Sequence, residues 1–188
     1  MQSHYDIGND FYSLWLDETM QYSCAYFEDE NTTLYEAQMN KIHRILDKLY
    51  LKEGMRLLDI GCGWGYLLLE AAKKYKIKGT GITLSHEQYE KFQERIKENH
   101  LEDYLEVKLM DYRDLPKSGL EFDRVVSVGM VEHVGRENYQ LFNDCVDSVL
   151  AQGGLFLLHF ISGMDEKPGD AWMSKYIFRV ACSQAFAK

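Results

Sequence analysis

Cysteine and proline are scarce in this sequence. Its 188 residues include two prolines and four cysteines, namely Cys24, Cys62, Cys145 and Cys182. No two cysteines form a Cys-x-x-Cys pair, and this wide spacing argues against both a disulfide framework and a zinc site. We therefore expect a reducing compartment and no bound metal. Because only two prolines interrupt the chain, linkers are scarce, and the sequence indicates one continuous domain.

Positive charge and long apolar runs are also lacking. Lysine and arginine number 21 against 30 aspartates and glutamates, which gives a formal net charge of −9. This balance disfavours a general binder of nucleic acid or anionic membranes, because phosphate contacts need clustered basic side chains. No apolar run approaches the roughly 18 to 20 residues that cross a bilayer, and no signal peptide is expected. With 46% hydrophobic and 27% charged residues, the composition predicts a globular, cytoplasmic domain.

Aromatic residues are concentrated in the first 30 positions. They are Tyr5, Phe11, Tyr12, Trp15, Tyr22, Tyr26 and Phe27. A short helix is expected over 9–16, followed by an irregular loop over 17–27. Thr33 and Glu36 then form a capping-box pattern ahead of apolar residues at helical spacing. Residues 1–50 are therefore predicted to form a helical, aromatic lid segment.

From residue 51 the pattern changes to short apolar runs that alternate with helical stretches. Strands are expected at 56–60, 78–83, 104–110, 122–128 and 154–161, and helices at 66–75, 87–99 and 138–150. Strands separated by single helices imply right-handed crossovers and a parallel sheet that is covered on both faces. The predicted fold is therefore a doubly wound, mostly parallel α/β sheet over residues 51–178, with a short tail at 179–188.

The first of these strands runs into a glycine-rich turn. Asp59 precedes Gly61, Gly63 and Gly65, and the turn lies where such a sheet binds ligands. Glycines let the backbone approach a ligand without Cβ clashes, although a tight strand-to-helix turn alone would also explain them. The spacing differs from the Gly-x-Gly-x-x-Gly pattern of dinucleotide sites, and no Walker Gly-Lys-Ser/Thr follows. It suits S-adenosylmethionine (SAM), whose ammonium group a nearby carboxylate can orient.

Polar residues follow the next two expected strands. Thr83 and Leu84 stand where an NAD site would need an acid for the ribose, which disfavours NAD. Ser85-x-x-Gln88 is a capping-box pattern, and with a nucleotide in the crevice the same polar residues would also face it. Asp111 stands where an acceptor for the adenine amino group is expected, although, taken alone, a solvated loop acid is the simpler interpretation.

Five motifs occur in a fixed order along the chain. They are His4-Tyr5-Asp6-x-Gly8-Asn9-Asp10-Phe11-Tyr12, Tyr22-Ser23-Cys24-Ala25-Tyr26-Phe27, Asp59-Ile60-Gly61-Cys62-Gly63-Trp64-Gly65, Asp111-Tyr112-Arg113-Asp114 and Val128-Gly129-Met130-x-Glu132-His133-Val134-Gly135. Together they closely resemble the cyclopropane-fatty-acyl-phospholipid synthase family, which includes the mycolic acid cyclopropane synthases. The resemblance implies the Rossmann-like fold of SAM-dependent methyltransferases. It also implies methylene transfer from SAM to the cis double bond of unsaturated phospholipid acyl chains at the inner membrane surface.

The resemblance assigns roles to individual positions. Those that match the SAM pocket of such enzymes are Tyr22, Ser23, Gly61, Gly63, Thr83, Leu84, Gln88, Asp111 and Tyr112, beside Asp59 of the glycine-rich turn. Those that match the surroundings of a bound bicarbonate, which the family is thought to use as its base, are Cys24, Glu132, His159 and Ile161. Without the resemblance, each of three residues has a structural interpretation. Glu132 would be solvated at a strand end, His159 a hydrogen-bonded core histidine and Cys24 a small core residue.

The sequence departs from the family pattern near its end. A family-like run over 172–178 passes directly into 179–186, which resembles a piece near the family's C-terminus that contains a cysteine proposed as catalytic. Cys182 matches that cysteine, and an inert cysteine in a short terminal helix is the alternative. Two further strands of the family are therefore expected to be missing. A methyltransferase for a small-molecule amine or hydroxyl and a non-catalytic SAM-binding fragment stay open as alternatives. The oligomeric state also stays open, with a homodimer as one arrangement.

Overall fold

Strands and helices alternate along the chain. The structure is a computed structural model that describes residues 8–163, 171–172 and 184–185. The strands are β1 (Arg56–Ile60), β2 (Lys78–Thr83), β3 (Leu105–Leu109), β4 (Phe122–Val128), β5 (Leu150–His159), β6 (Ser162–Gly163) and β7 (Gln184–Ala185). The helices are α2 (Asn9–Ser13), α3 (Leu34–Lys48), α4 (Tyr66–Tyr75), α5 (His86–Glu98) and α6 (Tyr139–Asp147), with short 3₁₀ turns η1 (Tyr112–Lys117), η2 (Val131–His133) and η3 (Arg136–Asn138). Cys182 and most of the expected tail lie outside the described residues.

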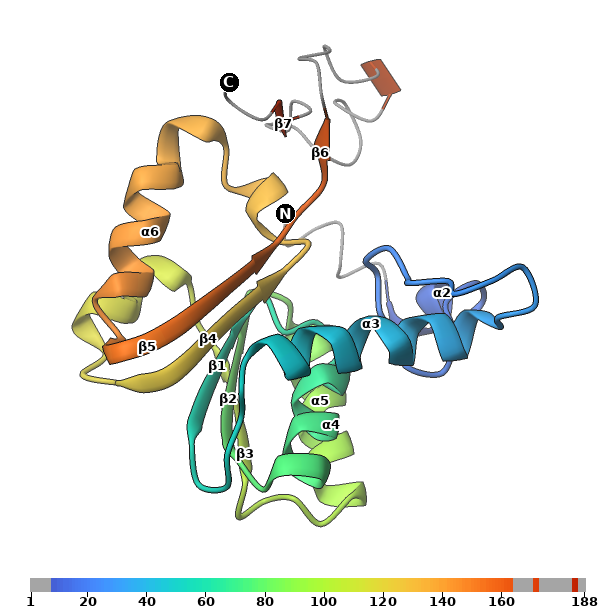
Figure 1. Ribbon diagram of the computed structural model, residues 1–188, viewed down its shortest axis with the longest axis horizontal. Helices are drawn as coiled ribbons and strands as arrows, with labels where there is room; N and C mark the ends of the chain where they lie inside the picture. Colours follow the sequence, from blue (N-terminus) through green and yellow to red (C-terminus); the bar gives the residue numbers. More distant parts are fainter. Residues whose placement is uncertain (1–7, 164–170, 173–183, 186–188) are drawn as a thin grey trace.

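The first five strands form one parallel sheet in the order β3-β2-β1-β4-β5 (Figure 1). At its centre, Leu58 of β1 pairs with Thr80 of β2 on one side and Val125 of β4 on the other. The chain moves outward from β1 to β3 and then returns to β4, so the strand order reverses beside β1. Ligands of such sheets bind at this reversal, beyond the carboxyl ends of the strands. The predicted doubly wound parallel fold is confirmed, and it places the ligand crevice after β1 and β4.

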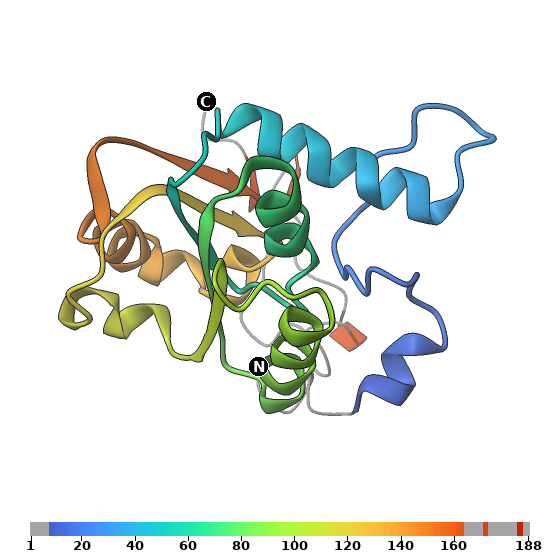
Figure 2. The same ribbon diagram turned by 90° about the horizontal axis from the view of Figure 1, so that it is seen from below.

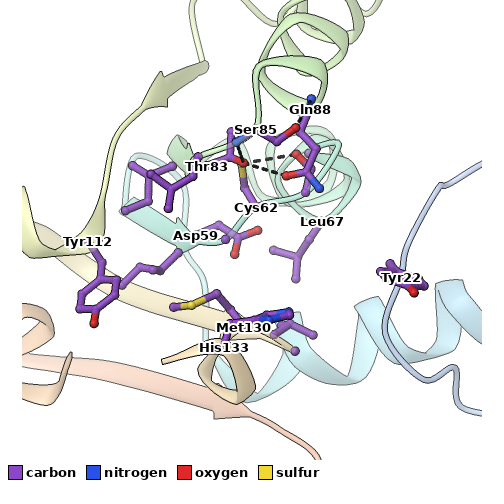
Figure 3. A pocket seen from close by; sticks show the side chains of 18 of the residues that line it. Tyr22, Asp59, Cys62, Leu67, Thr83, Ser85, Gln88, Tyr112, Met130 and His133 are labelled. Carbon is purple, nitrogen blue, oxygen red and sulfur yellow. Dashed lines mark hydrogen bonds between the residues drawn. The ribbon is translucent and has the colours of Figure 1, made fainter. Parts of the chain in front are cut away.

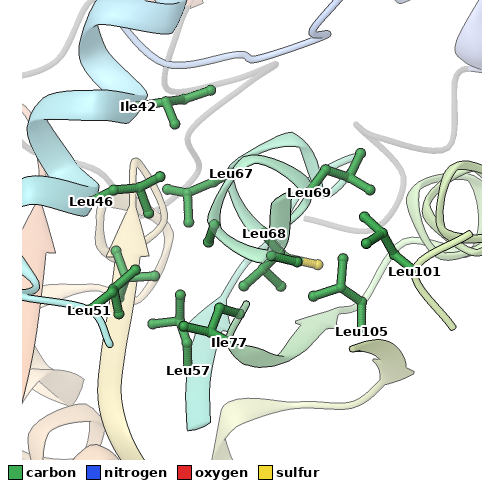
Figure 4. Close-up of a cluster of buried hydrophobic side chains, with 14 of the residues drawn as sticks. Ile42, Leu46, Leu51, Leu57, Leu67, Leu68, Leu69, Ile77, Leu101 and Leu105 are labelled. Atoms are coloured by element: carbon green, nitrogen blue, oxygen red, sulfur yellow. The ribbon is translucent and has the colours of Figure 1, made fainter. Parts of the chain in front are cut away.

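Helices cover both faces of the sheet. One face packs against α3, α4 and α5, and the other packs against α6 and η1 (Figures 1 and 4). Successive residues of β1 point to opposite faces, so Leu57 joins the first core and Leu58 joins the second. Both side chains are fully buried. Burial on both faces explains why the neighbouring positions Leu57 and Leu58 are both apolar instead of alternating with polar residues.

Residues 8–33, called the N-terminal segment below, lie beside the layer of α3, α4 and α5, on the side away from α6 (Figures 1 and 2). Thr33 Oγ1 accepts a hydrogen bond from the Glu36 amide at 3.3 Å, and the Glu36 carboxylate accepts one from the Thr33 amide at 2.9 Å. The predicted capping box of α3 is therefore confirmed. The stretch between α2 and α3 is irregular, as expected. Arg95 of α5 anchors it by donating to the backbone carbonyls of Glu18 and Thr19 at 2.9 and 3.2 Å.

The largest difference from the expected elements lies at β5. The pattern predicts a helix over 138–150, whereas α6 ends at Asp147 and β5 begins at Leu150. Leu150 pairs with Phe122 of β4, after which the register shifts. Gly153 follows within this irregular part, and its φ of +76° is a conformation that glycine adopts without strain. The expected start of this strand at residue 154 is therefore wrong, and Gly153 lies at an irregularity inside the strand.

Gly65, between β1 and α4, provides a test of how tightly this turn is packed. Its φ is +83°, and a Cβ there would lie 2.1 Å from the ring of Phe92, which is fully buried. Gly54 is a matched control, since its φ is +80° but no atom lies within 4 Å of its Cβ position. We expect Gly54→Ala to lower the free energy of unfolding by about 1 kcal/mol through backbone strain. Gly65→Ala should lower it by about 3 kcal/mol, because overpacking adds to the strain.

Urea denaturation of both variants measures this difference. If Gly54→Ala and Gly65→Ala lowered the free energy of unfolding equally, the contact with Phe92 would not constrain the turn.

Candidate cofactor and active site

A cavity of about 410 Å³ opens at the carboxyl ends of the strands, where the strand order reverses. Its walls come from the turns after β1, β2, β3 and β4 and from residues 19–23 of the N-terminal segment (Figure 3). This volume lies within the range of small-molecule sites, about 300 to 1,000 Å³. All of the expected SAM-pocket residues line it, namely Tyr22, Ser23, Asp59, Gly61, Gly63, Thr83, Leu84, Gln88, Asp111 and Tyr112. Residues far apart in the sequence thus share one cavity.

The glycine-rich turn brings main-chain atoms to this cavity. Gly61 and Gly63 have φ values of +79° and +55°. The amides of Gly61 and Cys62 both donate to the carbonyl of Ile82 in β2, at 3.0 and 3.1 Å. A Cβ at Gly61 would lie 2.6 Å from Cγ of Met130, in the turn after β4. Glycine is therefore needed here for the ends of β1, β2 and β4 to approach one another.

Asp59 supplies a buried carboxyl group on the cavity wall. Its side chain comes from β1 and is 3% exposed. Burial raises the pKa of Asp59 to about 7, because the carboxylate loses its hydration. A positively charged ligand group in the cavity would favour the ionised form and lower this pKa again. The cavity is therefore electrostatically suited to a cation.

Thr83, Ser85 and Gln88 form a hydrogen-bonded group at the N-terminus of α5 (Figure 3). Thr83 Oγ1 donates to Gln88 Oε1 at 2.7 Å and accepts from the Ser85 amide at 3.2 Å. Ser85 Oγ accepts from the Gln88 amide at 3.3 Å, which confirms the cap at Ser85. All three residues are buried and line the cavity. The two interpretations of this motif are thus compatible, since the residues that cap the helix also form the wall.

Asp111 is held in place by Arg113. Its carboxylate oxygens accept from the Arg113 guanidinium at 2.9 and 2.6 Å and from the Arg113 amide at 2.9 Å. These hydrogen bonds hold the pKa of Asp111 below its ordinary value. Tyr112 packs edge-to-face against Phe142, with ring centroids 5.2 Å apart. Asp111 therefore belongs to a surface turn and to the cavity wall at once, with a fixed orientation.

The wall formed by residues 19–23 is attached to α3 through side chains. Gln38 Nε2 donates to the carbonyls of Gln21 and Ser23 at 3.4 and 3.2 Å. Lys41 Nζ donates to Ser23 Oγ at 2.8 Å. Tyr22 lies between these anchored residues, and partial burial raises the pKa of its hydroxyl. The position of this wall is thus set by α3.

Glu132 and His159 lie close to the cavity wall but do not line it. Gly129 lines the cavity, and its amide donates to the His159 carbonyl at 2.9 Å. Glu132 is 9% exposed, and its Oε1 accepts from the Ile161 amide at 2.7 Å. Among the described residues, Glu132 Oε2 and His159 Nδ1 are buried without a hydrogen-bond partner. Glu132 is therefore buried and His159 half-buried, and each has an unsatisfied polar atom.

The environment of His159 keeps its ring neutral. Burial lowers its pKa, the ammonium of Lys41 lowers it further, and the charge of Glu132 opposes these effects. A neutral imidazole can accept a hydrogen bond at one nitrogen and donate at the other. Together with the Glu132 carboxyl group, it can hold a small group that both donates and accepts hydrogen bonds.

Cys24 is exposed, so it is not the small core residue that its type alone suggested. It lines a second cavity together with Trp15 and Phe27. This second cavity shares Tyr22 and Ser23 with the first, so the two adjoin. Cys24 is therefore placed beside the wall of the cofactor-sized cavity, on a surface with aromatic neighbours.

Several cavity residues were not expected from the sequence. Trp64 is 3% exposed and lines the cavity, and its Nε1 donates to Asn9 Oδ1 at 2.6 Å. It connects the N-terminal segment to the glycine-rich turn, and its place inside the Asp59–Gly65 motif was the available signal. His133 also lines the cavity, and nothing in its local sequence pattern indicates this position.

Within the described part of the chain, no group of three or more His, Cys, Asp or Glu residues is placed to hold a metal ion. No helix there is long and apolar enough to span a membrane.

The sequence is similar to those of known proteins. The family described as Mycolic acid cyclopropane synthetase matches residues 1–183. A Cyclopropane-fatty-acyl-phospholipid synthase of Escherichia coli (strain K12) is 47% identical over 182 residues, covering 96% of this chain and 46% of the relative. A Probable fatty acid methyltransferase of Pseudomonas putida is 44% identical over 181 residues, with 93% and 46% covered. The chain thus spans about half the length of the curated relatives it matches.

Solved structures agree with these relatives. The mycolic acid cyclopropane synthase CmaA1 complexed with SAH and CTAB aligns with a TM-score of 0.88 at 36% identity, covering 98% of this chain and 68% of that one. Coclaurine N-methyltransferase, bound to N-methylheliamine and SAH, aligns with a TM-score of 0.84 at 26% identity, with 98% and 57% covered. The architecture, the glycine-rich turn and the match across nearly the whole sequence lead to one conclusion: the chain belongs to the mycolic acid cyclopropane synthetase family.

Proposed function

We propose that this chain binds SAM and transfers a methylene group to the cis double bond of an unsaturated phospholipid acyl chain. The observation that carries the proposal is the neighbourhood of two features. One is a cation-suited cavity around Asp59, and the other is the pair of unsatisfied polar atoms on Glu132 and His159 near its wall. The relatives named above as cyclopropane synthases support the same reaction for this chain.

Different cavity residues bind different parts of SAM. In this proposal Asp59 orients the ammonium of the amino acid end, and the glycine-rich turn lets the backbone come close. Thr83 and Gln88 present polar groups at the N-terminus of α5. Asp111, held by Arg113, is oriented to accept from the adenine amino group. When bound, SAM supplies an electrophilic methyl group on a sulfonium.

The second task of this chain is to protect a positively charged substrate. An isolated alkene is a weak nucleophile, so the acyl chain has to be aligned closely with the donor. Methylation of the alkene leaves a carbocation, which water would capture. Tyr12, Trp15 and Tyr22 form a cluster of aromatic rings in the N-terminal segment, with centroids 5.2 to 5.7 Å apart. Such rings exclude water and their faces favour a cation, so we assign this segment as the cover of the reaction site.

The third task is to hold a base. Glu132 Oε2 and His159 Nδ1 fit bicarbonate, because that ion carries one O–H to donate and oxygens to accept. When bound, bicarbonate supplies the base that takes a proton from the new methyl group before the ring closes. Glu132 would accept the O–H and orient the ion, while the Ile161 amide holds Glu132 itself. Cys24 adjoins the site from the second cavity, and we include it among the residues that border the ion.

A second candidate function is methylation of a small-molecule amine. The structural similarity to Coclaurine N-methyltransferase favours it, since the same fold serves many acceptors. A third role, SAM binding without catalysis, stays open beside these two. Bicarbonate dependence separates the first two, because amine methylation gives no reason to expect it.

SAM binding is expected to weaken as the pH falls below 7. Asp59 is protonated there in the free protein, so binding of a cation must release that proton. The dissociation constant should rise up to about tenfold per pH unit between pH 7 and 5.5, where the SAM ammonium stays charged. Isothermal titration calorimetry at several pH values measures this.

Asp59→Asn is the control for this titration. The variant should bind SAM more weakly at pH 7 and lose most of the pH dependence. Because burial opposes ionisation of Asp59, its raised pKa destabilises the ligand-free fold as the pH rises from 4 to 7. Asp59→Asn should therefore melt at a higher temperature than the wild type at pH 8. A pH dependence that persists in the variant would rule out Asp59 as its source.

Glu132→Gln and His159→Gln test the proposed reaction. Both should abolish formation of an acyl product heavier by one methylene, measured by mass spectrometry after incubation with SAM and unsaturated phospholipid vesicles. Both should retain SAM binding, because neither side chain lines the cofactor-sized cavity. Loss of SAM binding in both variants would indicate a structural role instead. A wild-type chain that binds SAM but forms no acyl product, with or without bicarbonate, would support the non-catalytic role.

A further inference from the structure

Lys41 is a buried lysine that the reaction outlined above does not use. It lies on the inner side of α3 and is 4% exposed, although lysine is almost never buried unless it is paired. Its Nζ donates to Ser23 Oγ at 2.8 Å. Among the described residues the ammonium has no ion-pair partner. Burial lowers the pKa of Lys41 to about 8, so it is still charged at pH 7.

A path of contacts connects Lys41 to the residues assigned to the base. Ser23, which holds the ammonium, packs closely against the turn after β4. A Cβ on Gly129 would lie 3.3 Å from Ser23 Cβ. The Gly129 amide donates to the His159 carbonyl at 2.9 Å. The contacts therefore run from α3 through the Tyr22–Cys24 stretch to the end of β5.

An anion bound beside Glu132 and His159 would also need a cation nearby. The Glu132 carboxyl group raises the pKa of His159, against the lowering by burial and by Lys41. His159 contributes no positive charge when its ring is neutral. The other groups that face His159 are Lys41 and Lys48 of α3, and Lys48 is exposed to solvent. An anion beside Glu132 would be repelled unless a cation with little solvent screening lies nearby, and Lys41 meets that condition.

We infer that Lys41 is a positioning residue for this site, whose buried ammonium holds Ser23 against Gly129 and favours a small anion beside Glu132 and His159. The inference rests on the proposed function, in which that anion is bicarbonate. The inference also accounts for a buried ammonium whose hydrogen-bond partner is only a hydroxyl group, because the bound anion would offset the free-energy cost of burying the charge.

The test is a titration of the chain with sodium bicarbonate, followed through the NMR signals of isotope-labelled His159. Sodium chloride at equal ionic strength is the control. Lys41→Met removes the charge and keeps the length of the side chain. It should raise the dissociation constant for bicarbonate about tenfold, as expected for the loss of a close, desolvated charge. It should also raise the pKa of His159, and it should affect SAM binding much less than bicarbonate binding.

Lys48→Met is the matched control, because Lys48 lies on the same helix but is exposed. It should leave the bicarbonate affinity unchanged. Bicarbonate affinity and a His159 pKa that are both unchanged in Lys41→Met would overturn the role of Lys41 and leave the proposed function standing. A wild-type chain that does not bind bicarbonate would overturn the proposed base, and the inference with it.

Thermal unfolding checks that Lys41→Met is folded, and its midpoint should not fall, since a buried charge has been removed. If this variant does not fold, Lys41→Arg and Ser23→Ala provide the test. Lys41→Arg keeps the charge and should retain most of the bicarbonate affinity. Ser23→Ala removes the hydroxyl group that holds the Lys41 ammonium, and it should lose more of the bicarbonate affinity than Lys41→Arg does. The reverse order would overturn the inference.

Discussion

The close approach of three strand ends is the constraint on which the rest of the structure depends. β1 and β4 end beside one another because Gly61 has no side chain to collide with Met130, and α5 packs against the same turn because Gly65 has none to collide with Phe92. The amides of the turn are satisfied by a carbonyl of β2. This packing leaves a cavity next to a buried carboxyl group instead of filling the space with apolar side chains. The fold and the site therefore have the same physical origin.

The sequence predicted the central sheet more reliably than its surroundings. The bounds expected for β1, β2, β4 and α4 agree with the structure, because a strand buried on both faces and an amphipathic helix carry local, periodic signals. The predicted start of β5 at residue 154 was wrong, because the strand begins at Leu150 and Gly153 lies inside its irregular part. Here strand pairing, which no local pattern encodes, decided the outcome.

The same distinction applies to the site. The expected cofactor residues follow strand ends, and the topology of a doubly wound sheet brings such residues together, so their meeting in one cavity could be anticipated. Their roles stay predictions. The burial of Trp64 and Lys41 could not be predicted from the sequence, because it depends on contacts between distant segments, with Asn9 and with Ser23. A lysine at a helical position is usually solvated, and only tertiary structure shows that this one is not.

One wall of the cavity is attached by side chains rather than by strand pairing. Arg95, Gln38 and Lys41 hold residues 18–23 through hydrogen bonds that reach across from α5 and α3. These hydrogen bonds are separate from the strand ladder, so a change that broke them would release this wall while β1, β2 and β4 kept their register. Under the proposed function, exchange of the cofactor would then depend on this flank and not on the sheet.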